Sequence, residues 1–396
     1  MPIAPTELPW CLRKERVTPE TKSRAMHVAI DAHAVGTKLA GNETYITGLI
    51  EALAAIDCEN RYTLYVTKPQ AVRKFARRWP NVELRRTLPH TPFIRIPLSL
   101  VAELCLRPVD LLHVQFTAPP VTPCPVVVTV HDLAFEHLPE TFRRRSWMQL
   151  RLTVRWTTKR AAQIIVPSEY TRRDLIATYG IAPDRITVTP LAAASRFAPV
   201  EAARVRRVCA RYGIQGAYIL AVGSIQPRKN LGRLFAAYER LQRKSAQGNL
   251  PRLVVVGKRA WLFETTLRAA ERLGDRVLFT GYVPEEDLPP LYAGALCFVY
   301  PSFFEGFGLP PLEAMQCGTP VLVGNRTSLP EVVGEAGLMV NPFDEAELAE
   351  ALERLIEDAS LRAELSRRGL ERARQFNWHH TARLTLEAYK KAAGAA

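Results

Sequence analysis

Hydrophobic residues along the chain fall into short continuous runs, separated by longer stretches in which they recur every three or four positions. Such runs, rich in Val, Ile and Leu and bounded by Gly, Pro or Ser, are typical of parallel strands covered on both faces. In the first half the predicted strands are His27–Ala32, Tyr62–Thr67, Val82–Arg86, Leu111–Phe116, Val126–His131, Ile164–Pro167 and Ile186–Thr189. In the second half they are Tyr218–Val222, Leu253–Val256, Val277–Thr280, Cys297–Tyr300, Val321–Val323 and Leu338–Val340.

The stretches between these runs are amphipathic and suit the helical crossovers that parallel strands require. The alternation runs through the 396 residues twice, so we predict an α/β protein of two Rossmann-like, doubly wound parallel-sheet domains facing a cleft. The predicted domains are residues 26–205 and 206–377, with the break near Ala198–Arg211. Residues 378–396 are predicted to form a helix that crosses back to the first domain, and residues 1–25 a disordered leader.

Composition excludes several classes of protein. No run reaches the ~18 uncharged apolar residues of a membrane-spanning helix, and no basic-then-apolar start suggests a cleaved export signal. The seven cysteines form no CxxC pair and lie at no metal-ligand spacing from a histidine, which indicates reduced thiols in a cytoplasmic protein and no structural zinc.

The chain is basic, with 53 Lys and Arg against 39 Asp and Glu and a net charge of +14. Residues 61–107 hold ten basic and two acidic side chains, and residues 143–173 hold nine and one. In the second window Arg151, Arg155 and Lys159 share one helix face.

Two interpretations of this charge stay open. It is either a solvated surface or a surface that docks on anionic lipid, where each Lys or Arg contributes about 1 kcal/mol. The apolar segment Pro92–Leu106 could then enter the lipid surface. Nucleic-acid binding is disfavoured, because no zinc-finger, RNP-like or basic-region motif is present and aromatic residues do not interleave the basic ones.

Candidate chemistry gathers where predicted strands end, which is where open α/β sheets bind ligands. The segment Tyr300–Glu313 combines Glu305, then Gly306 and Gly308, then a predicted helix start near Leu309, an arrangement suited to a diphosphate. Glu313 could accept ribose hydroxyls and Glu305 those of a sugar. A plain glycine turn with solvated glutamates is the alternative.

Three further segments follow strands in the same way. In Ala221–Leu231, Arg228 and Lys229 could neutralise a leaving diphosphate, and Asn230 could cap the following helix. The alternative for this segment is a helix cap flanked by solvated charges, with no role in binding. His131, after the fifth strand, could bind a sugar hydroxyl or move a proton, or be structural. Gly41 and Asn42 end a loop just before a helix and could approach a phosphate. His33 and His113 are expected to serve packing.

Taken together, these segments resemble the retaining nucleotide-sugar glycosyltransferases of family 4, which have the GT-B fold. The resemblance covers residues 26–390 and is strongest at Glu-Gly-Phe-Gly-Leu-Pro-Pro-Leu-Glu-Ala-Met from Glu305, the family's Glu-x7-Glu motif. Pro-Arg-Lys-Asn-Leu from Pro227, Gly-Thr-Pro-Val-Leu-Val from Gly318, Val-His-Asp-Leu from Val130 and Val-Pro-Ser-Glu-Tyr-Thr from Val166 also match.

The resemblance implies that the first domain binds the acceptor and the second the donor, with no metal or other cofactor. Lys229 and Arg228 would hold the diphosphate, Glu313 the ribose and Glu305 the donor sugar, and His131 would contact that sugar near the reacting carbon. The other implied donor-binding residues are Gly306, Phe307, Gly308 and Leu309 through their amides, and Val283 in the base pocket. Ser224 stands where many relatives carry an arginine, and Gly41 with Asn42 where they carry paired glycines.

The function expected from this resemblance is retaining transfer of a hexose from a nucleoside-diphosphate sugar to a hydroxyl of a saccharide or lipid-linked acceptor in bacterial polysaccharide or glycolipid assembly. Mannose from GDP-mannose is the first candidate donor. A peripheral location on the inner face of the plasma membrane is a further hypothesis. A nucleotide-sugar epimerase of the same fold and a non-catalytic nucleotide-sugar or lipid-binding protein are the alternatives.

Overall fold

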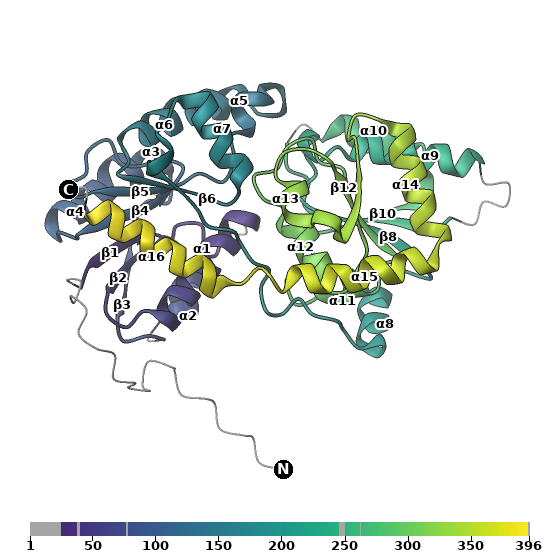
Figure 1. The fold of residues 1–396 in the computed structure, drawn as a ribbon, viewed down its shortest axis with the longest axis horizontal. Coiled ribbons are helices and arrows are strands. Elements are labelled where there is room, and N and C mark those ends of the chain that lie inside the picture. Colours follow the sequence, from purple (N-terminus) through teal and green to yellow (C-terminus); the bar gives the residue numbers. More distant parts are fainter. Residues whose placement is uncertain (1–24, 38–39, 77, 245–249, 262, 395–396) are drawn as a thin grey trace, which may run out of the picture.

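The computed structural model describes residues 25–394 apart from 38–39, 77, 245–249 and 262, and the expected leader 1–25 lies almost wholly outside the described residues. The described chain forms two parallel sheets, one in each half of the molecule (Figure 1). The first has the order β3-β2-β1-β4-β5-β6-β7 and the second the order β10-β9-β8-β11-β12-β13. The predicted two-domain, doubly wound α/β fold is therefore confirmed.

Each of the thirteen predicted strands is present, with ends that differ by two residues at most. The first sheet contains β1 (His27–Asp31), β2 (Arg61–Val66), β3 (Val82–Arg86), β4 (Leu111–Gln115), β5 (Val126–Thr129), β6 (Gln163–Val166) and β7 (Ile186–Val188). The second contains β8 (Tyr218–Val222), β9 (Arg252–Val256), β10 (Val277–Gly281), β11 (Cys297–Tyr300), β12 (Val321–Gly324) and β13 (Gly337–Val340). Central strands such as β4 and β11 are buried along their whole length, because helices cover both sheet faces.

Crossover helices connect the strands. The first domain contains α1 (Ala40–Ile56), α2 (Pro69–Phe75), α3 (Pro92–Ile94), a π-helical turn (Arg95–Leu100), α4 (Val101–Leu106), α5 (Ala134–His137), α6 (Arg144–Arg160) and α7 (Glu169–Tyr179). The second contains α8 (Ala202–Arg211), α9 (Leu231–Lys244), α10 (Glu264–Glu271), α11 (Leu288–Ala293), α12 (Leu309–Gln316), α13 (Leu329–Val333), α14 (Glu345–Glu357) and α15 (Ala359–Ala373). Within the described residues, no helix is both long and apolar enough to cross a bilayer.

The last helix, α16 (Trp378–Gly394), leaves the second domain and packs on α1 and on strands β4 to β7 of the first (Figure 1). The ring of Trp378 lies so close to Gly48 of α1 that a Cβ there would come within 2.4 Å of it. Further along the helix, the Tyr389 hydroxyl lies 2.7 Å from His113 Nδ1 on β4. The predicted crossover helix is thus confirmed, and His113 serves packing as expected.

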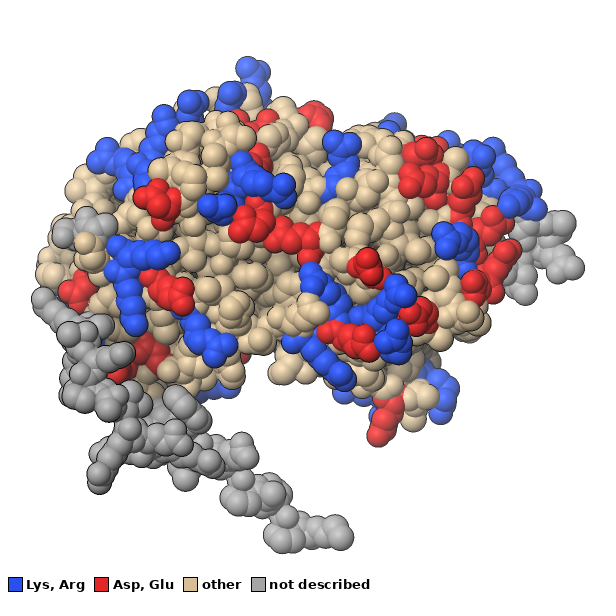
Figure 2. Space-filling view, viewed as in Figure 1, with Lys and Arg blue, Asp and Glu red and all other residues tan. Residues whose placement is uncertain are grey.

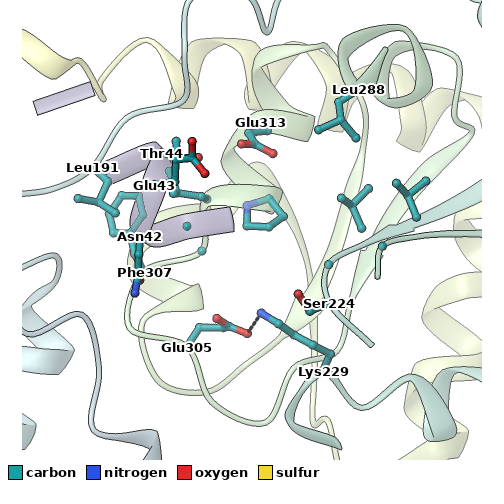
Figure 3. Close-up of a pocket in the computed structure, with 18 of the residues that line it drawn as sticks. Asn42, Glu43, Thr44, Leu191, Ser224, Lys229, Leu288, Glu305, Phe307 and Glu313 are labelled. Atoms are coloured by element: carbon teal, nitrogen blue, oxygen red, sulfur yellow. Dashed lines mark hydrogen bonds and ion pairs between the residues drawn. The ribbon is translucent and has the colours of Figure 1, made fainter. Parts of the chain in front are cut away.

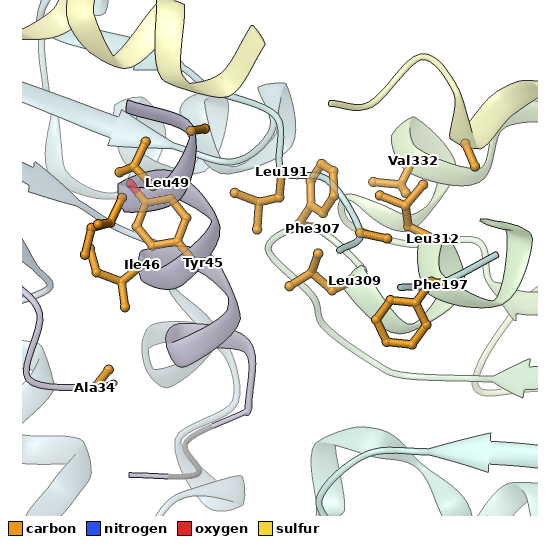
Figure 4. Packing of buried hydrophobic residues seen from close by; sticks show 14 of the residues in the cluster. Ala34, Tyr45, Ile46, Leu49, Leu191, Phe197, Phe307, Leu309, Leu312 and Val332 are labelled. Carbon is orange, nitrogen blue, oxygen red and sulfur yellow. The ribbon is translucent and has the colours of Figure 1, made fainter. Parts of the chain in front are cut away.

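Apolar side chains of both domains meet in one buried cluster beneath the cleft. Tyr45, Ile46 and Leu49 of α1 lie on one side, and the loop and helix around Phe307 and Leu309 on the other (Figure 4). This shared core holds the carboxyl end of the first sheet against that of the second.

Candidate active site

A cavity of about 580 Å³ lies between the two domains. It is lined by the thirteen residues that the sequence singled out, which are Glu305, His131, Lys229, Arg228, Gly41, Asn42, Ser224, Val283, Gly306, Phe307, Gly308, Leu309 and Glu313. The first domain contributes Gly41, Asn42 and His131, and the second contributes the rest, so the cavity is closed only when the domains face each other (Figure 3).

Glycines shape the floor of the cavity. Gly223 and Gly257 follow β8 and β9 with φ of +151° and +154°, and a Cβ on Gly257 would lie 1.9 Å from the Gly223 carbonyl oxygen. Gly308, with φ +123°, precedes α12, which begins at Leu309 as predicted and carries Pro310 in its first turn. The open amides of this loop therefore lead into the helix start.

Glu305 lies at the centre of the charged cluster. Lys229 Nζ donates to its Oε1 at 2.7 Å (Figure 3). Ser302 Oγ donates to the same oxygen, and Arg228 Nη1 lies 3.4 Å from Oε2. Burial alone raises the pKa of Glu305, but Arg228 and Lys229 outweigh it and hold that pKa at about 2. Glu305 is therefore ionised at neutral pH and fixed in place.

Arg228 also reaches across the cleft. Its Nη1 donates to the Phe304 carbonyl oxygen at 2.8 Å and lies 3.4 Å from Asp132 Oδ2 in the first domain. Lys229 meanwhile donates to the Tyr300 hydroxyl as well as to Glu305. Both cations thus lie against the Glu305 loop, and one of them links the two domains.

Glu313, one turn into α12, lies in different surroundings. Tyr292 donates its hydroxyl to Glu313 Oε2 at 2.9 Å. Burial raises the pKa of Glu313 to about 7, since no cation makes a direct contact among the described residues. The carboxyl group can therefore both accept and donate hydrogen bonds near neutral pH, which suits a pair of hydroxyls.

His131 is a half-buried, neutral imidazole beyond the end of β5. Its Nε2 donates to Gln115 Oε1 at 2.9 Å, and the edges of Tyr45 and Phe116 pack at centroid distances of 4.7 and 5.4 Å. Burial lowers the pKa of His131 to about 4. The ring is thus suited to hydrogen bonding with a neutral hydroxyl.

Gly306 brings the two halves of the site into direct contact. A Cβ on Gly306 would lie 1.7 Å from the His131 carbonyl oxygen. Ser168 Oγ and Thr171 Oγ1, at the start of α7, donate to the Gly306 carbonyl at 2.7 and 3.2 Å. The loop of Glu305 is therefore seated on the first domain.

The structure corrects one feature of the first loop. Gly41 and Asn42 lie inside the first turn of α1, which begins at Ala40, rather than in a loop before the helix. The first four amides of a helix need no intrahelical partner, so these poor helix formers are tolerated there.

The Asn230 amide donates to the carbonyls of Pro301 and Pro342, so it joins two loops beside α9.

Sequence reasoning missed the residues that hold the site together. Ser302 and Tyr300 contact Glu305 and Lys229, Tyr292 contacts Glu313, and Asp132 faces Arg228. Ser302 and Tyr300 flank the motif and could have been inferred, whereas Tyr292 and Asp132 reach the site only through tertiary packing. Among the described residues, no group of three or more His, Cys, Asp or Glu is arranged to bind a metal ion.

Two facing parallel-sheet domains with this cleft and a returning C-terminal helix define the GT-B class of glycosyltransferases. The family model "Glycosyltransferase Family 4" matches residues 40–193, and "Glycosyl transferases group 1" matches residues 213–372. The chain therefore belongs to the glycosyltransferases that these two family models describe, and its relatives indicate the same family.

Among these relatives, O-antigen chain mannosyltransferase B of Escherichia coli is 39% identical over 269 residues, covering 67% of this chain and 70% of that protein. The serotype-specific mannosyltransferase WbdA of Escherichia coli is 34% identical over 238 residues, covering 59% of this chain but only 29% of that much longer protein. Among solved structures, WaaG, a glycosyltransferase involved in lipopolysaccharide biosynthesis, matches with a TM-score of 0.70 and 19% identity, covering 91% of this chain and 98% of WaaG. That structural match supports the fold alone.

Proposed function

We propose that the protein is a retaining, metal-independent hexosyltransferase that takes mannose from a nucleoside-diphosphate mannose, with GDP-mannose as first candidate, and adds it to a saccharide or lipid-linked acceptor in bacterial polysaccharide assembly. The observation that carries the proposal is the convergence of Lys229, Arg228, Glu305 and the start of α12 on one cavity. The choice of mannose is supported by the names of the two mannosyltransferase relatives. Anabaena HepE, solved with UDP-glucose, has the same fold at a TM-score of 0.69 and 19% identity, covering 92% of this chain and 99% of HepE.

In this proposal the donor diphosphate lies between Lys229 and the amides of Gly306 to Leu309. Arg228 and Lys229 balance Glu305 and Asp132 in the cluster, so their charges alone sum to zero. The helix start of α12 and its open amides then supply the positive potential that receives the phosphates. Charge that builds on the leaving diphosphate is stabilised without rearrangement, because these dipoles are already fixed.

The remaining donor contacts follow from position. The Glu313 carboxyl group binds the ribose hydroxyls, and buried Val283 lies against the base. Glu305, ionised and held by Ser302, accepts hydroxyls of the hexose, and His131 faces the same sugar from the first domain.

Retention follows from same-face attack. The bond between the anomeric carbon and the diphosphate oxygen breaks as the acceptor oxygen bonds to that carbon, and the acceptor proton passes to the leaving diphosphate oxygen. Glu305 does not act as a covalent nucleophile here, because Lys229, Arg228 and Ser302 already engage its carboxylate. The start of α12 and its open amides, with Lys229 against the diphosphate, take the place of the divalent metal that other transferases use.

The experiment is donor turnover by the purified chain. Lys229→Ala and Glu313→Ala are expected to reduce turnover at least about a hundredfold while the thermal unfolding curve stays cooperative. The matched control is Lys244→Ala, which should keep full activity, because the Lys244 ammonium pairs with Glu353 on the surface of the second domain. Full turnover by Lys229→Ala would remove the assignment.

Two further measurements separate the alternatives. A nuclear magnetic resonance assay of the product linkage tests retention, and incubation without acceptor tests for the epimerase, which would convert the donor alone. A thermal-shift screen of nucleoside diphosphates identifies the base, because a ligand of the folded state raises its stability. Turnover that persists in a chelator tests metal independence.

We also propose a location on the inner face of the plasma membrane, through a docking surface on the first domain. Of the eleven exposed large hydrophobic side chains in the described part of the chain, nine lie between Leu88 and Trp156. The docking surface is formed by Phe93, Ile94, Leu98, Leu106, Val121, Met148, Leu152 and Trp156.

The two segments that carry most of these residues pack on one core, because Leu100 and Leu104 belong to the same cluster of buried side chains as Val154 of α6. Helix α6 holds six basic and no acidic residues, and basic side chains gather along the edge of the domain that it forms (Figure 2). An apolar stripe with basic flanks is the arrangement that binds anionic lipid.

The test is flotation with phosphatidylglycerol-containing vesicles. We expect binding at low salt that Leu152→Glu with Trp156→Glu abolishes and that high salt weakens. Absence of binding at low salt refutes the docking surface but leaves the transferase intact. The buried thiols of Cys209, Cys297 and Cys317, which form no disulfide, support placement on the cytoplasmic side.

A further inference from the structure

Three basic side chains meet at the carboxyl ends of β1, β2 and β3. His33 follows β1, Lys68 follows β2 and His90 follows β3, and the two imidazole centroids are 6.4 Å apart. Gly36, three residues after His33, lines the cavity between the domains, and a Cβ added to Gly36 would lie 3.2 Å from Lys68 Cβ. The cluster therefore borders the cavity on the first-domain side, at the sheet edge where open α/β sheets bind ligands.

Both imidazoles are anchored through Nδ1. His33 Nδ1 donates to Asp31 Oδ2 at 3.1 Å, because an ionised carboxylate can only accept. Thr67 Oγ1 donates to the His33 carbonyl at 3.3 Å and so accepts from His90 Nδ1 at 2.8 Å. The described residues offer neither Nε2 atom a hydrogen-bond partner, so two fixed rings present the same nitrogen side by side.

A buried ion pair lies beneath these rings. Arg95 Nη1 donates to both oxygens of Asp31 at 2.7 and 2.8 Å, and the two side chains are 1% and 2% exposed. The Asp31 carboxylate is thus already engaged by Arg95 and His33. Asp31 and Arg95 act here as positioning residues.

The electrostatic field at the cluster is positive. Burial lowers the pKa of His90 most, and Lys68, His33 and Arg95 lower it further, whereas Asp31 opposes them only weakly. Residues 61–107 as a whole carry ten basic and two acidic side chains. A bound anion would offset this repulsion at His90.

The position of the cluster points to the source of that anion. Arg95 opens the π-helical turn directly after Phe93 and Ile94, which are 70% and 44% exposed, and Leu98 follows at 63%. A ligand with its charged group on His33 and His90 can therefore place an apolar chain along this segment and a saccharide toward the cavity.

We propose that His33, Lys68 and His90 bind a phosphate group of the acceptor, at the junction between its lipid and its saccharide. The inference rests on the proposed transfer to a lipid-linked acceptor and specifies the class, a lipid phosphate or diphosphate. His33, which the sequence pattern assigned to packing, thereby becomes an acceptor-binding residue.

The test uses the full chain with histidine rings labelled with ¹⁵N, titrated with inorganic phosphate. We expect the Nε2 signals of His33 and His90 to shift and the protonation midpoint of His90 to rise. His379 and His380, exposed on α16, serve as internal controls and stay unchanged. Lys68→Gln is expected to weaken phosphate binding about tenfold, the value of one charge-assisted hydrogen bond. Rings that do not respond to phosphate overturn the proposal.

Two further arms identify the source. A water-soluble short-chain prenyl diphosphate should bind at least about tenfold more tightly than inorganic phosphate, because its chain buries apolar surface. If only phosphatidylglycerol vesicles shift the Nε2 signals of His33 and His90, the phosphate that binds here belongs to bulk membrane lipid, and the assignment to the acceptor is wrong. Donor hydrolysis by the same chain is measured in parallel, so that loss of this site and loss of the transferase are distinguished.

Discussion

Replacing Gly306 by alanine tests the idea that catalysis depends on contact between the two domains. The new Cβ would lie 1.7 Å from the His131 carbonyl oxygen, 2.7 Å from its carbon and 2.9 Å from Asp132 Cβ. Real Cβ contacts essentially never fall below 3.0 Å, so the gap must widen from 1.7 Å by at least 1.3 Å. The nearest obstacle is backbone and not a flexible side chain, so the Glu305 loop and the segment that follows β5 must move apart.

The expected consequence is kinetic. A displacement of about 1 Å between groups on opposite sides of a reaction costs about a hundredfold in rate. Gly306→Ala should therefore lower kcat by about that factor, while each domain keeps its own core and the melting temperature changes by a few degrees.

The assay is steady-state donor turnover beside differential scanning calorimetry. Gly232→Ala is the matched control, because a Cβ at that position in α9 meets nothing within 4 Å, and it should be fully active and slightly more stable. A Gly306→Ala chain with wild-type kcat would refute the reasoning, since the closed contact would then be dispensable.

The other predictions concern buried groups. Folding raises the pKa of Glu313 from 4.5 to about 7, so the contribution of this group to stability falls as the pH rises between those values. In urea titrations, Glu313→Gln should be more stable than the natural chain at pH 8 by at most about 3 kcal/mol, and the two should be equally stable at pH 4. With the pKa of His131 at about 4, a pH–rate profile should show no titration of this ring between pH 6 and 8, and a midpoint near 7 that belongs to Glu313 should persist in His131→Gln. A midpoint near 6.5 that His131→Gln removes would contradict this. Trp378→Ala should cost about 2–4 kcal/mol in unfolding experiments because it empties the space against Gly48, whereas Trp156→Ala on the exposed face of α6 should cost under about 1 kcal/mol.

Much of this architecture could be predicted from the sequence because parallel strands covered on both faces leave an unambiguous signal. The short, β-branched run Val126–Val130 favours a buried strand over a helix, and ligand binding at the carboxyl ends of such strands then places His131 at the cleft. Glu305, Lys229 and Glu313 were found because each lies within a few residues of a strand end or helix start.

Contacts between distant segments could not be predicted in this way. Asp132 faces Arg228 only because the domains meet, and Tyr292 reaches Glu313 from another helix. The start of α1 was misplaced by local reasoning, since Gly and Asn usually signal a loop, while the surrounding core favours helix from Ala40 onward. Roles that depend on packing across the cleft require coordinates.

The returning helix α16 also determines the order in which the protein can be completed. The first domain buries Tyr389 against His113 and Trp378 against Gly48, yet both aromatic residues leave the ribosome after the entire second domain. During synthesis, α1 and strands β4 to β7 therefore lack these contacts until α16 has been made. A chain that stops just before this helix would therefore contain every strand of the second sheet and lack only the packing of α16 on the first domain.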